Sequence, residues 1–382
     1  MLSLSLAFLT SLIITLLVIR YQHLHAHMTA DHDLDGVQKF HSVPVPRIGG
    51  VGVYLGLLAG LLAKQWVDDP VAAPNLLLLA CALPAFGAGL TEDLTKRVGV
   101  RERLLATVFS ALLGGYFLGA WLTRLDIPGL DSLLHPPTLR VGLDAITITI
   151  TGFLAIAVTA FAVAGVANAF NIIDGYNGLA GVVAIISLLG LAYVADHVGD
   201  RMVLLGAITT VGAAAGFLIW NYPSGLIFLG DGGAYCVGFL VAELSVLLVA
   251  RNPQVSPWFP LLLSFYPIFE TLFSIFRRVI IGKSHPGLPD AAHLHQLIYR
   301  RVVRWAVGST CHKQKTHRNA LTSPYLWVMS TFAVIPATIF WQSSRMLQLF
   351  ALLFAATYLL IYRSIYQARF PKWLSIQQKR KP

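Results

Sequence analysis

Long apolar segments separated by short polar ones constrain this chain more than any other feature of its sequence. A helix needs about 20 mostly apolar residues to cross the hydrocarbon core of a bilayer. Because 56% of the 382 residues are hydrophobic and only 12% are charged, the sequence predicts an all-α polytopic membrane protein that forms one domain over residues 1–382. The eleven predicted spans are Leu2–Ile19, Gly49–Ala63, Asn75–Leu90, Leu104–Leu122, Leu143–Ala167, Leu179–Ala195, Met202–Trp220, Ala234–Ala250, Trp258–Phe276, Pro324–Trp341 and Met346–Tyr362.

The positive charges are distributed unevenly between the two sides of these spans. Alternate loops and the C-terminal tail carry 22 of the 28 Lys and Arg residues, and the loops between them carry the other six. Since basic loops stay on the cytoplasmic side of a membrane, the N-terminus is predicted outside and the C-terminus in the cytoplasm. The net charge of +10 follows from this asymmetry, so it predicts no nucleic-acid partner.

Five polar stretches fall on the predicted cytoplasmic side. They are residues 20–48, 91–103, 168–178, 221–233 and 277–323. Loops that only connect helices would give no such sorting of acids, amides and histidines to one face. The arrangement therefore predicts one cytoplasmic site built from distant parts of the chain, since polar residues at membrane depth are functional candidates by default.

The stretch from Asn168 to Leu179 carries three amide side chains, one carboxylate and two glycines between two apolar segments. If it is helical, Asn171, Asp174 and Gly178 share one face. The same residue types are common where helices end, so a helix-capping loop is an equal alternative.

Two further acidic motifs suit a divalent cation with oxygen ligands. Glu92 and Asp93 are adjacent at the end of a span, where carboxylates are costly without a partner. The alternative is that they pair with Lys96 and Arg97 along a helix. Asp231 stands in a Gly-Asp-Gly-Gly turn, whose backbone amides could cradle phosphate while the acid holds Mg²⁺, although an ordinary turn has the same composition.

The first polar stretch contains residues that suit a phosphate-handling site. Three acids precede two cationic side chains there: Asp31, Asp33, Asp35, Lys39 and His41. Such a cluster could supply a general base beside phosphate-binding groups, and a solvated loop is the alternative.

Polar residues also surround the ninth predicted span. His293 and His295 lie two residues apart, so a loop or a helix start would let both point into a cleft and contact phosphate rather than metal. Glu270 lies inside the span and needs a partner, for which Arg277 and Arg278 are candidates.

The chain resembles the polyprenyl-phosphate N-acetylhexosamine-1-phosphate transferases, the integral-membrane enzymes that start cell-envelope polysaccharide synthesis. The likeness covers roughly residues 30–300. It rests on five motifs in order: His41–Gly50, Glu92-Asp93, Asn168–Leu179, Phe228–Gly233 and Asp290–Gln296. The Pro-Val-Pro-Arg-Ile-Gly-Gly form of the first motif is similar to the branch that uses UDP-N-acetylglucosamine-type sugars.

The resemblance implies a reaction in which the phosphate of a polyprenyl (undecaprenyl) lipid attacks the sugar-linked phosphorus of a UDP-sugar. UMP leaves and a polyprenyl-diphospho-sugar forms, the first step toward a lipopolysaccharide such as O-antigen. Such enzymes use Mg²⁺, with Mn²⁺ as a substitute, and lie in the bacterial cytoplasmic membrane. A second copy of the chain is a further candidate partner.

The resemblance also implies roles for matching positions. The catalytic residues are Asp33, Glu92 and Asp93, the metal ligands are Asp93 and Asp231, and the substrate-binding residues are Lys39, His41, Asn168, Asn171, Asp174, Asn177, His293 and His295. The chain departs from the family pattern where Glu92 and Asn177 replace Asp and where Gln296 replaces His. Asp35 stands where Pro is common, which leaves the choice of base among Asp31, Asp33 and Asp35 open.

A secondary transporter is the alternative from another functional class. Transporters usually combine inverted repeats with charge near the bilayer centre. Here only Glu243 and Glu270 lie within predicted spans, and the other acids of interest gather at one face. That distribution favours the transferase, and a scaffold protein would need neither paired acids nor the glycine turn.

Overall fold

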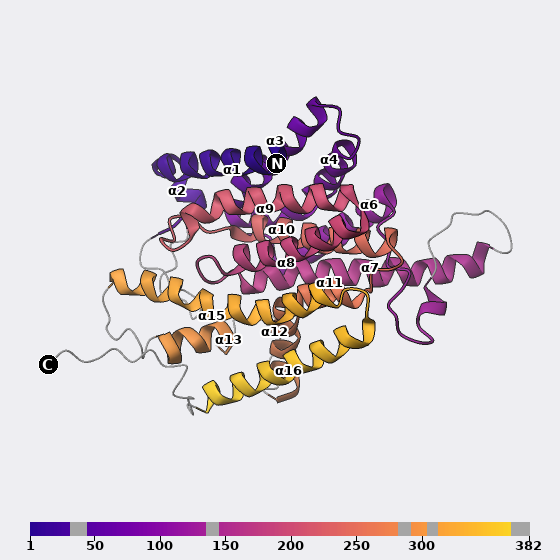
Figure 1. Ribbon diagram of the computed structural model, residues 1–382. Coiled ribbons are helices and arrows are strands. Elements are labelled where there is room, and N and C mark those ends of the chain that lie inside the picture. Colours follow the sequence, from indigo (N-terminus) through magenta and orange to yellow (C-terminus); the bar gives the residue numbers. More distant parts are fainter. Residues whose placement is uncertain (31–43, 135–144, 282–291, 304–311, 368–382) are drawn as a thin grey trace.

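The computed structural model describes residues 1–30, 44–134, 145–281, 292–303 and 312–367, and these segments are helical apart from connecting turns and one isolated bridge between Ala30 and Pro46 (Figure 1). The α-helices are α1 (Leu2–Arg20), α2 (Gln22–Thr29), α3 (Gly49–Trp66), α4 (Ala72–Cys81), α5 (Leu83–Thr95), α6 (Val100–Leu118), α7 (Ala145–Ile173), α8 (Leu179–Val198), α9 (Arg201–Asn221), α10 (Gly230–Arg251), α11 (Trp258–Leu263), α12 (Phe265–Phe276), α13 (Leu294–Leu297), α15 (His312–Ile339) and α16 (Ser344–Tyr366). The short helices of other types are the 3-10 helix η1 (Asp131–Leu133) and the π-helices η2 (Arg277–Ile281) and η3 (Ile298–Val303).

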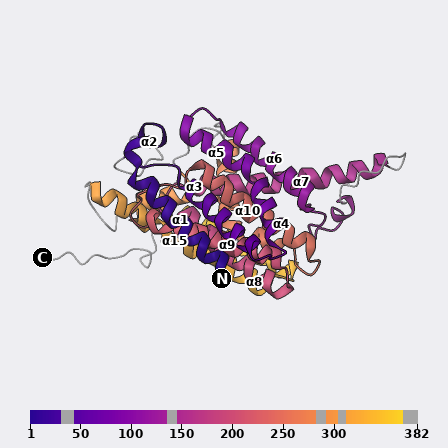
Figure 2. The same cartoon turned by 90° about the horizontal axis from the view of Figure 1, so that it is seen from above.

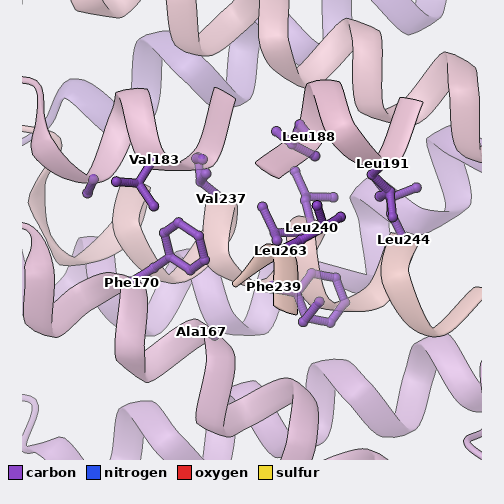
Figure 3. Packing of buried hydrophobic residues seen from close by; sticks show 14 of the residues in the cluster. Ala167, Phe170, Val183, Leu188, Leu191, Val237, Phe239, Leu240, Leu244 and Leu263 are labelled. Carbon is purple, nitrogen blue, oxygen red and sulfur yellow. The ribbon is translucent and has the colours of Figure 1, made fainter. Parts of the chain in front are cut away.

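Helix α10 forms the centre of the bundle. Every residue from Gly230 to Val249 is buried, as expected of a helix that is apolar on all sides. It packs against α3, α5, α7, α8 and α9. Figure 3 shows Val237, Phe239 and Leu240 of α10 packed in one apolar cluster with Phe170 of α7 and Leu188 of α8. The start of α10, which carries Asp231, is therefore held from several directions.

The arrangement is that of a multi-pass membrane protein. Among the described residues, seven helices are long and apolar enough to cross a bilayer, and an eighth crossing results if the bent pair α4–α5 is one span. The other predicted spans correspond to α3, α6 and the α11–α12 pair. The count of eleven and the orientation stay predictions. The first turns of α7 project beyond the other helices in both views (Figures 1 and 2).

Several helix ends differ from those expected. Residues Ile146–Ile150 alternate isoleucine with threonine, a pattern that also suits a strand, but they belong to α7. That helix continues to Ile173, so Asn168 and Asn171 lie in its last turns and not in a loop. Helix α15 begins at His312 and not near Pro324, because its first turns are polar and leave no hydropathy signal.

Two other polar stretches are also more helical than expected. Helix α5 extends to Thr95 and α6 begins at Val100, so the connection between them is much shorter than the predicted loop 91–103. Asp231 likewise lies in the first turn of α10 and not in a loop. The tight ends allow residues of neighbouring helices to contact each other directly.

Glu243 is buried in the middle of α10. A Cβ at Gly114 of α6 would overlap its carboxyl oxygen, and neither oxygen has a hydrogen-bond partner among the described residues. The small glycine therefore makes room for this acid between two helices.

The predicted orientation can be tested by cysteine labelling. Val67 follows α3, and Arg97 lies between α5 and α6; both are exposed. In a background without Cys311, a membrane-impermeant maleimide should label Val67→Cys in intact cells and Arg97→Cys only after permeabilisation. Cys81 and Cys236 are buried and should stay unlabelled. Labelling of both positions from outside would contradict the orientation.

Candidate functional site

The candidate site forms where the segment before α3 pairs with the segment before α10. Three backbone hydrogen bonds join them: Phe228 N to Pro46 O (2.9 Å), Gly49 N to Phe228 O (3.0 Å) and Gly50 N to Leu229 O (2.8 Å). The pairing brings the Arg47 backbone against Gly230, which has a φ of +76°. Glycine is the residue that adopts this conformation without steric cost.

Asp93, in the last turn of α5, holds the start of α10. Its Oδ1 accepts a hydrogen bond from the Asp231 backbone N (3.0 Å), and its Oδ2 accepts one from the Gly232 backbone N (2.9 Å). The residue is fully buried. A carboxylate at a helix N-terminus satisfies free N–H groups and interacts favourably with the helix dipole. Asp93 therefore fixes the position of Asp231.

The Asp231 carboxylate is the point where four helices or their flanking segments meet. Its Oδ1 accepts a hydrogen bond from Asn171 Nδ2 (2.9 Å) and lies 3.3 Å from Arg47 Nη2. Its Oδ2 forms an ion pair with Arg103 of α6. Arg47 Nη2 also lies 3.6 Å from Asp93 Oδ1. Two guanidinium groups thus face two carboxylates at one junction.

Asp174 follows directly after α7 and lies outside the membrane-spanning segment. Burial raises the pKa of Asp174 to about 7; the Asp93 carboxylate acts in the same direction, whereas Arg47 and the Gly230 backbone N–H lower the pKa. These three partners place Asp174 beside the Asp93–Asp231 junction. Because this pKa lies near neutral pH, a cation beside Asp174 would favour the ionised form of its carboxyl group.

Glu92 and Asn168 lie next to this junction but have other contacts. Glu92 Oε2 accepts a hydrogen bond from the backbone N of Val98 (2.8 Å), which closes the turn between α5 and α6. Asn168 Oδ1 accepts a hydrogen bond from Tyr235 (3.0 Å), whose ring lies under the Arg103 guanidinium. The Glu92 contact fixes the turn that follows Asp93, and the Asn168 contact fixes the Tyr235 ring beside Arg103.

Asn177 joins the loop after α7 to α15. Its backbone N donates to Asn319 Oδ1 (2.7 Å), its backbone O accepts from Ser323 Oγ (2.6 Å), and its Nδ2 donates to Pro223 O (3.2 Å). The side-chain Oδ1 is buried and has no hydrogen-bond partner among the described residues. Asn177 thus holds the loop in place, and its role toward a nucleotide stays a prediction.

His293 and His295 lie at the start of α13 and are both buried. Their rings stack with centroids 5.1 Å apart, and the edge of Tyr176 meets His295 at 5.5 Å. Because Tyr176 follows Asp174 by two residues, the histidine segment contacts the loop that carries this acid.

Glu270 of α12 is buried, and its hydrogen bonds differ from those expected. It accepts hydrogen bonds from His293 Nδ1 (3.0 Å), the Leu294 backbone N (3.0 Å) and the Tyr358 hydroxyl of α16 (2.9 Å), and not from Arg277 or Arg278. A carboxylate with three donors is well satisfied in a buried position. Glu270 therefore anchors the histidine segment to α16.

Replacement of Tyr358 by phenylalanine should lower the free energy of unfolding by about 1 kcal/mol, because it removes one hydrogen bond to Glu270. Glu270→Gln should cost more, about 2–3 kcal/mol, because an amide cannot accept all three hydrogen bonds. Thermal unfolding in detergent measures both. Tyr366→Phe, at the exposed end of the same helix, is the matched control. Equal effects of all three changes would contradict this role of Glu270.

Some predicted site residues lie outside the described part of the chain: Asp33, Lys39 and His41, with Asp31 and Asp35. The described residues bring Asp93, Asn171, Asp174 and Asp231 together at one point, with Asn168 beside it. Sequence reasoning did not single out Arg103, which had no signal beyond its positive charge. Arg47 was noticed only as part of a motif.

The donor atoms at the junction suit a hard cation. Among the described residues, no group of three or more His, Cys, Asp and Glu side chains has the geometry of a metal site. Mg²⁺, however, is usually held by one or two carboxylates together with substrate phosphates and water. The Asp231 carboxylate already faces two guanidinium groups, which stand in for positive charge at the place where such an ion would bind.

Comparison with known proteins relates this chain to one family of membrane transferases. The family model described as glycosyl transferase family 4 matches residues 75–249, which include Asp93, Asp174 and Asp231. The chain is similar to the undecaprenyl-phosphate alpha-N-acetylglucosaminyl 1-phosphate transferases of Thermotoga maritima (28% identity; 70% of this chain, 72% of the relative) and Escherichia coli K12 (24%; 70% and 69%). It is also similar to the decaprenyl-phosphate N-acetylglucosaminephosphotransferase of Mycobacterium tuberculosis (27%; 75% and 70%).

Proposed function

Because the model of glycosyl transferase family 4 matches residues 75–249 and the similar proteins are N-acetylglucosamine 1-phosphate transferases by name, we propose that this chain transfers N-acetylglucosamine 1-phosphate from a UDP-sugar to a polyprenyl phosphate and releases UMP. An oxygen of the lipid phosphate forms a bond to the sugar-linked phosphorus, and the bond from that phosphorus to the bridging oxygen of the UMP group breaks. The product is a polyprenyl-diphospho-sugar, the starting unit of an envelope polysaccharide. The enzyme would act at the cytoplasmic face of the bacterial inner membrane.

The observation that carries this proposal is the charge arrangement at the start of α10. Asp231, Asp93 and Asp174 converge there with Arg47 and Arg103. Phosphoryl transfer depends mainly on the positioning of the reactants and on the neutralisation of charge on the phosphates. Carboxylates for a divalent ion and guanidinium groups for phosphate oxygens are the residue types that this chemistry requires.

We propose Mg²⁺ as the cofactor, with Mn²⁺ as a substitute. When bound, the ion would neutralise charge on the diphosphate of the UDP-sugar. Asp231 would hold it, and Asp174, which lies near Asp93 and the Gly230 backbone N–H, is the candidate for a second oxygen ligand. Asp93 would act as a positioning residue through its hydrogen bonds to the start of α10, and its role as a direct ligand stays a prediction.

Other residues have proposed roles toward the two substrates. Arg47 and Arg103 would bind phosphate oxygens in bidentate fashion. Asn171, which donates to Asp231, would orient that carboxylate. His293 and His295 would contact phosphate, and Asp33, or one of its neighbours Asp31 and Asp35, would act as the base.

The secondary-transporter alternative is not retained. The similar proteins are transferases by name, and the carboxylates of the site lie at helix ends and not in the middle of spans. Of the two acids within predicted spans, Glu270 anchors the histidine segment and Glu243 packs against Gly114.

A transfer assay with a panel of UDP-sugars tests the proposal. The full-length protein in detergent is incubated with undecaprenyl phosphate, Mg²⁺ and one radiolabelled UDP-sugar at a time. We expect label in the lipid fraction and an equal amount of UMP, with the highest rate for UDP-N-acetylglucosamine. Without lipid, or with EDTA, both signals should be absent. UMP release without labelled lipid would contradict a transferase. Size measurement of the purified protein would test the proposed second copy.

A further inference from the structure

Arg47 is held in place by the backbone and not only by its charge. The segment 46–50 pairs with residues 228 and 229, and the Arg47 carbonyl oxygen lies against Gly230. These contacts hold the Arg47 backbone, so its guanidinium can change partners by rotation of the side chain. From the same backbone position, Nη2 lies 3.6 Å from Asp93 Oδ1 and 3.3 Å from Asp231 Oδ1.

Arg103 approaches the same carboxylate from the other side. It pairs with Asp231 Oδ2, and its guanidinium lies 5.8 Å from the centre of the Tyr235 ring. The Arg103 side chain is 11% exposed and the Asp231 side chain 13%. Water screens this pair much less than a surface pair, so each contact between unlike charges is strong.

Arg47 and Arg103 already supply two positive charges to the carboxylates of Asp93 and Asp231. Asp174 is a third acid beside them, and burial raises its pKa to about 7. A divalent cation that joined this group unchanged would leave an excess positive charge in a poorly screened place, which is unfavourable. It can bind well only if a guanidinium moves away or if an anion arrives with it.

We propose that Arg47 and Arg103 are internal cations, which occupy the Asp93–Asp231 pair in the resting protein and pass to the diphosphate of the nucleotide when a divalent cation takes their place. The inference rests on the proposed function and deepens it. The arginines then have two positions: on the carboxylates without substrate, and on phosphate with substrate. They compete with the metal in the first position and cooperate with it in the second.

Two measurable consequences distinguish this role from simple phosphate binding. Removal of the Arg47 charge should strengthen binding of a divalent ion to the substrate-free protein, whereas loss of an ordinary phosphate ligand would leave it unchanged. Binding of UDP-N-acetylglucosamine should tighten Mn²⁺ binding in the wild type, because the nucleotide draws the arginines away. By thermodynamic linkage, Mn²⁺ must then tighten nucleotide binding by the same factor.

The experiment titrates the full-length protein in detergent with Mn²⁺ and follows free Mn²⁺ by its electron paramagnetic resonance signal, with and without UDP-N-acetylglucosamine and without lipid acceptor. For Arg47→Gln we expect Mn²⁺ to bind about tenfold tighter than in the wild type without nucleotide. The tightening caused by nucleotide should become smaller. Arg47→Lys, which keeps the charge, should bind within about threefold of the wild type.

Arg201→Gln is the matched control, because Arg201 also faces a carboxylate (Asp69, 3.7 Å) but is 68% exposed and begins α9, whose other end leads to the start of α10. Its Mn²⁺ affinity should equal that of the wild type. Equal or weaker Mn²⁺ binding by Arg47→Gln, an equal gain in Arg201→Gln, or no Mn²⁺ binding by the wild type in the presence of UDP-N-acetylglucosamine would overturn the proposal. If Arg47→Gln cannot be purified, Arg103→Gln takes its place: tighter Mn²⁺ binding than in the wild type supports the proposal, and equal or weaker binding overturns it.

The failure of this inference can be told apart from a failure of the proposed function. A wild-type protein that transfers the sugar phosphate, combined with an unchanged Mn²⁺ affinity in Arg47→Gln, would reject only the internal-cation role. A wild-type protein that binds Mn²⁺ but forms no labelled lipid with any UDP-sugar would reject the function.

Discussion

Replacement of Asp231 by asparagine should lower the transfer rate roughly 1,000-fold, because loss of charge stabilisation at a reacting phosphate typically has an effect of this order. The change keeps the size of the side chain and removes its charge. It leaves Arg47 and Arg103 with one carboxylate instead of two and removes the proposed ligand of the metal. The measurement is the initial rate of labelled-lipid formation at saturating UDP-sugar and Mg²⁺.

Asp196→Asn is the matched control for this change. Asp196 is exposed and lies at the end of α8 that is remote in sequence from the Gly178 loop. Its replacement should leave the rate unchanged. Thermal unfolding of Asp231→Asn shows whether the protein stays folded. A folded Asp231→Asn protein with full activity would reject the placement of the metal on this side chain.

Gly230→Ala should inactivate the protein and also destabilise it, by about 2–5 kcal/mol. Gly230 has a φ of +76°, a conformation that is unfavourable for residues with a Cβ. The added Cβ would overlap the Arg47 carbonyl oxygen and would lie 2.6 Å from Asp93 Oδ2. Either the α10 start or the Arg47 segment must shift, and both shifts move the charged groups apart.

Gly165→Ala is the control, because a Cβ at Gly165 of α7 would meet no atom within 4 Å. Thermal unfolding and the transfer assay should both give wild-type values for it. A Gly230→Ala protein that unfolds at the wild-type temperature would show that the close contact of Gly230 with Arg47 and Asp93 is not needed.

Much of the architecture could be predicted because hydrophobic length is a local property of the chain. Segments such as Leu179–Ala195 and Met202–Trp220 are apolar for a full bilayer thickness, and both form long helices, α8 and α9. Helix ends were predicted less well, because polar turns at an end, as in His312–Ser323 of α15, are helical without being apolar. Backbone hydrogen bonding continues past the point where hydropathy falls.

The convergence of Asp93, Asp174 and Asp231 was expected from the sorting of polar stretches to one side of the membrane. Their individual contacts were not. Asp93 was predicted as a ligand of the metal ion, but its two carboxylate oxygens accept backbone hydrogen bonds from the start of α10. Glu270 was expected beside two nearby arginines, yet Tyr358, 88 positions away, is one of its partners.

The sequence by itself thus determined that this is a helical membrane protein similar to polyprenyl-phosphate sugar-phosphate transferases, and it predicted acids gathered at one face. Span length, loop charge and motif order are readable along the chain. Only the tertiary structure decided which charges meet. Arg47 and Asp231 are 184 positions apart, and no local pattern links them. The reason is physical: an ion pair depends on the final distance and burial of both groups, and these are set by how α3, α5, α6 and α10 pack together.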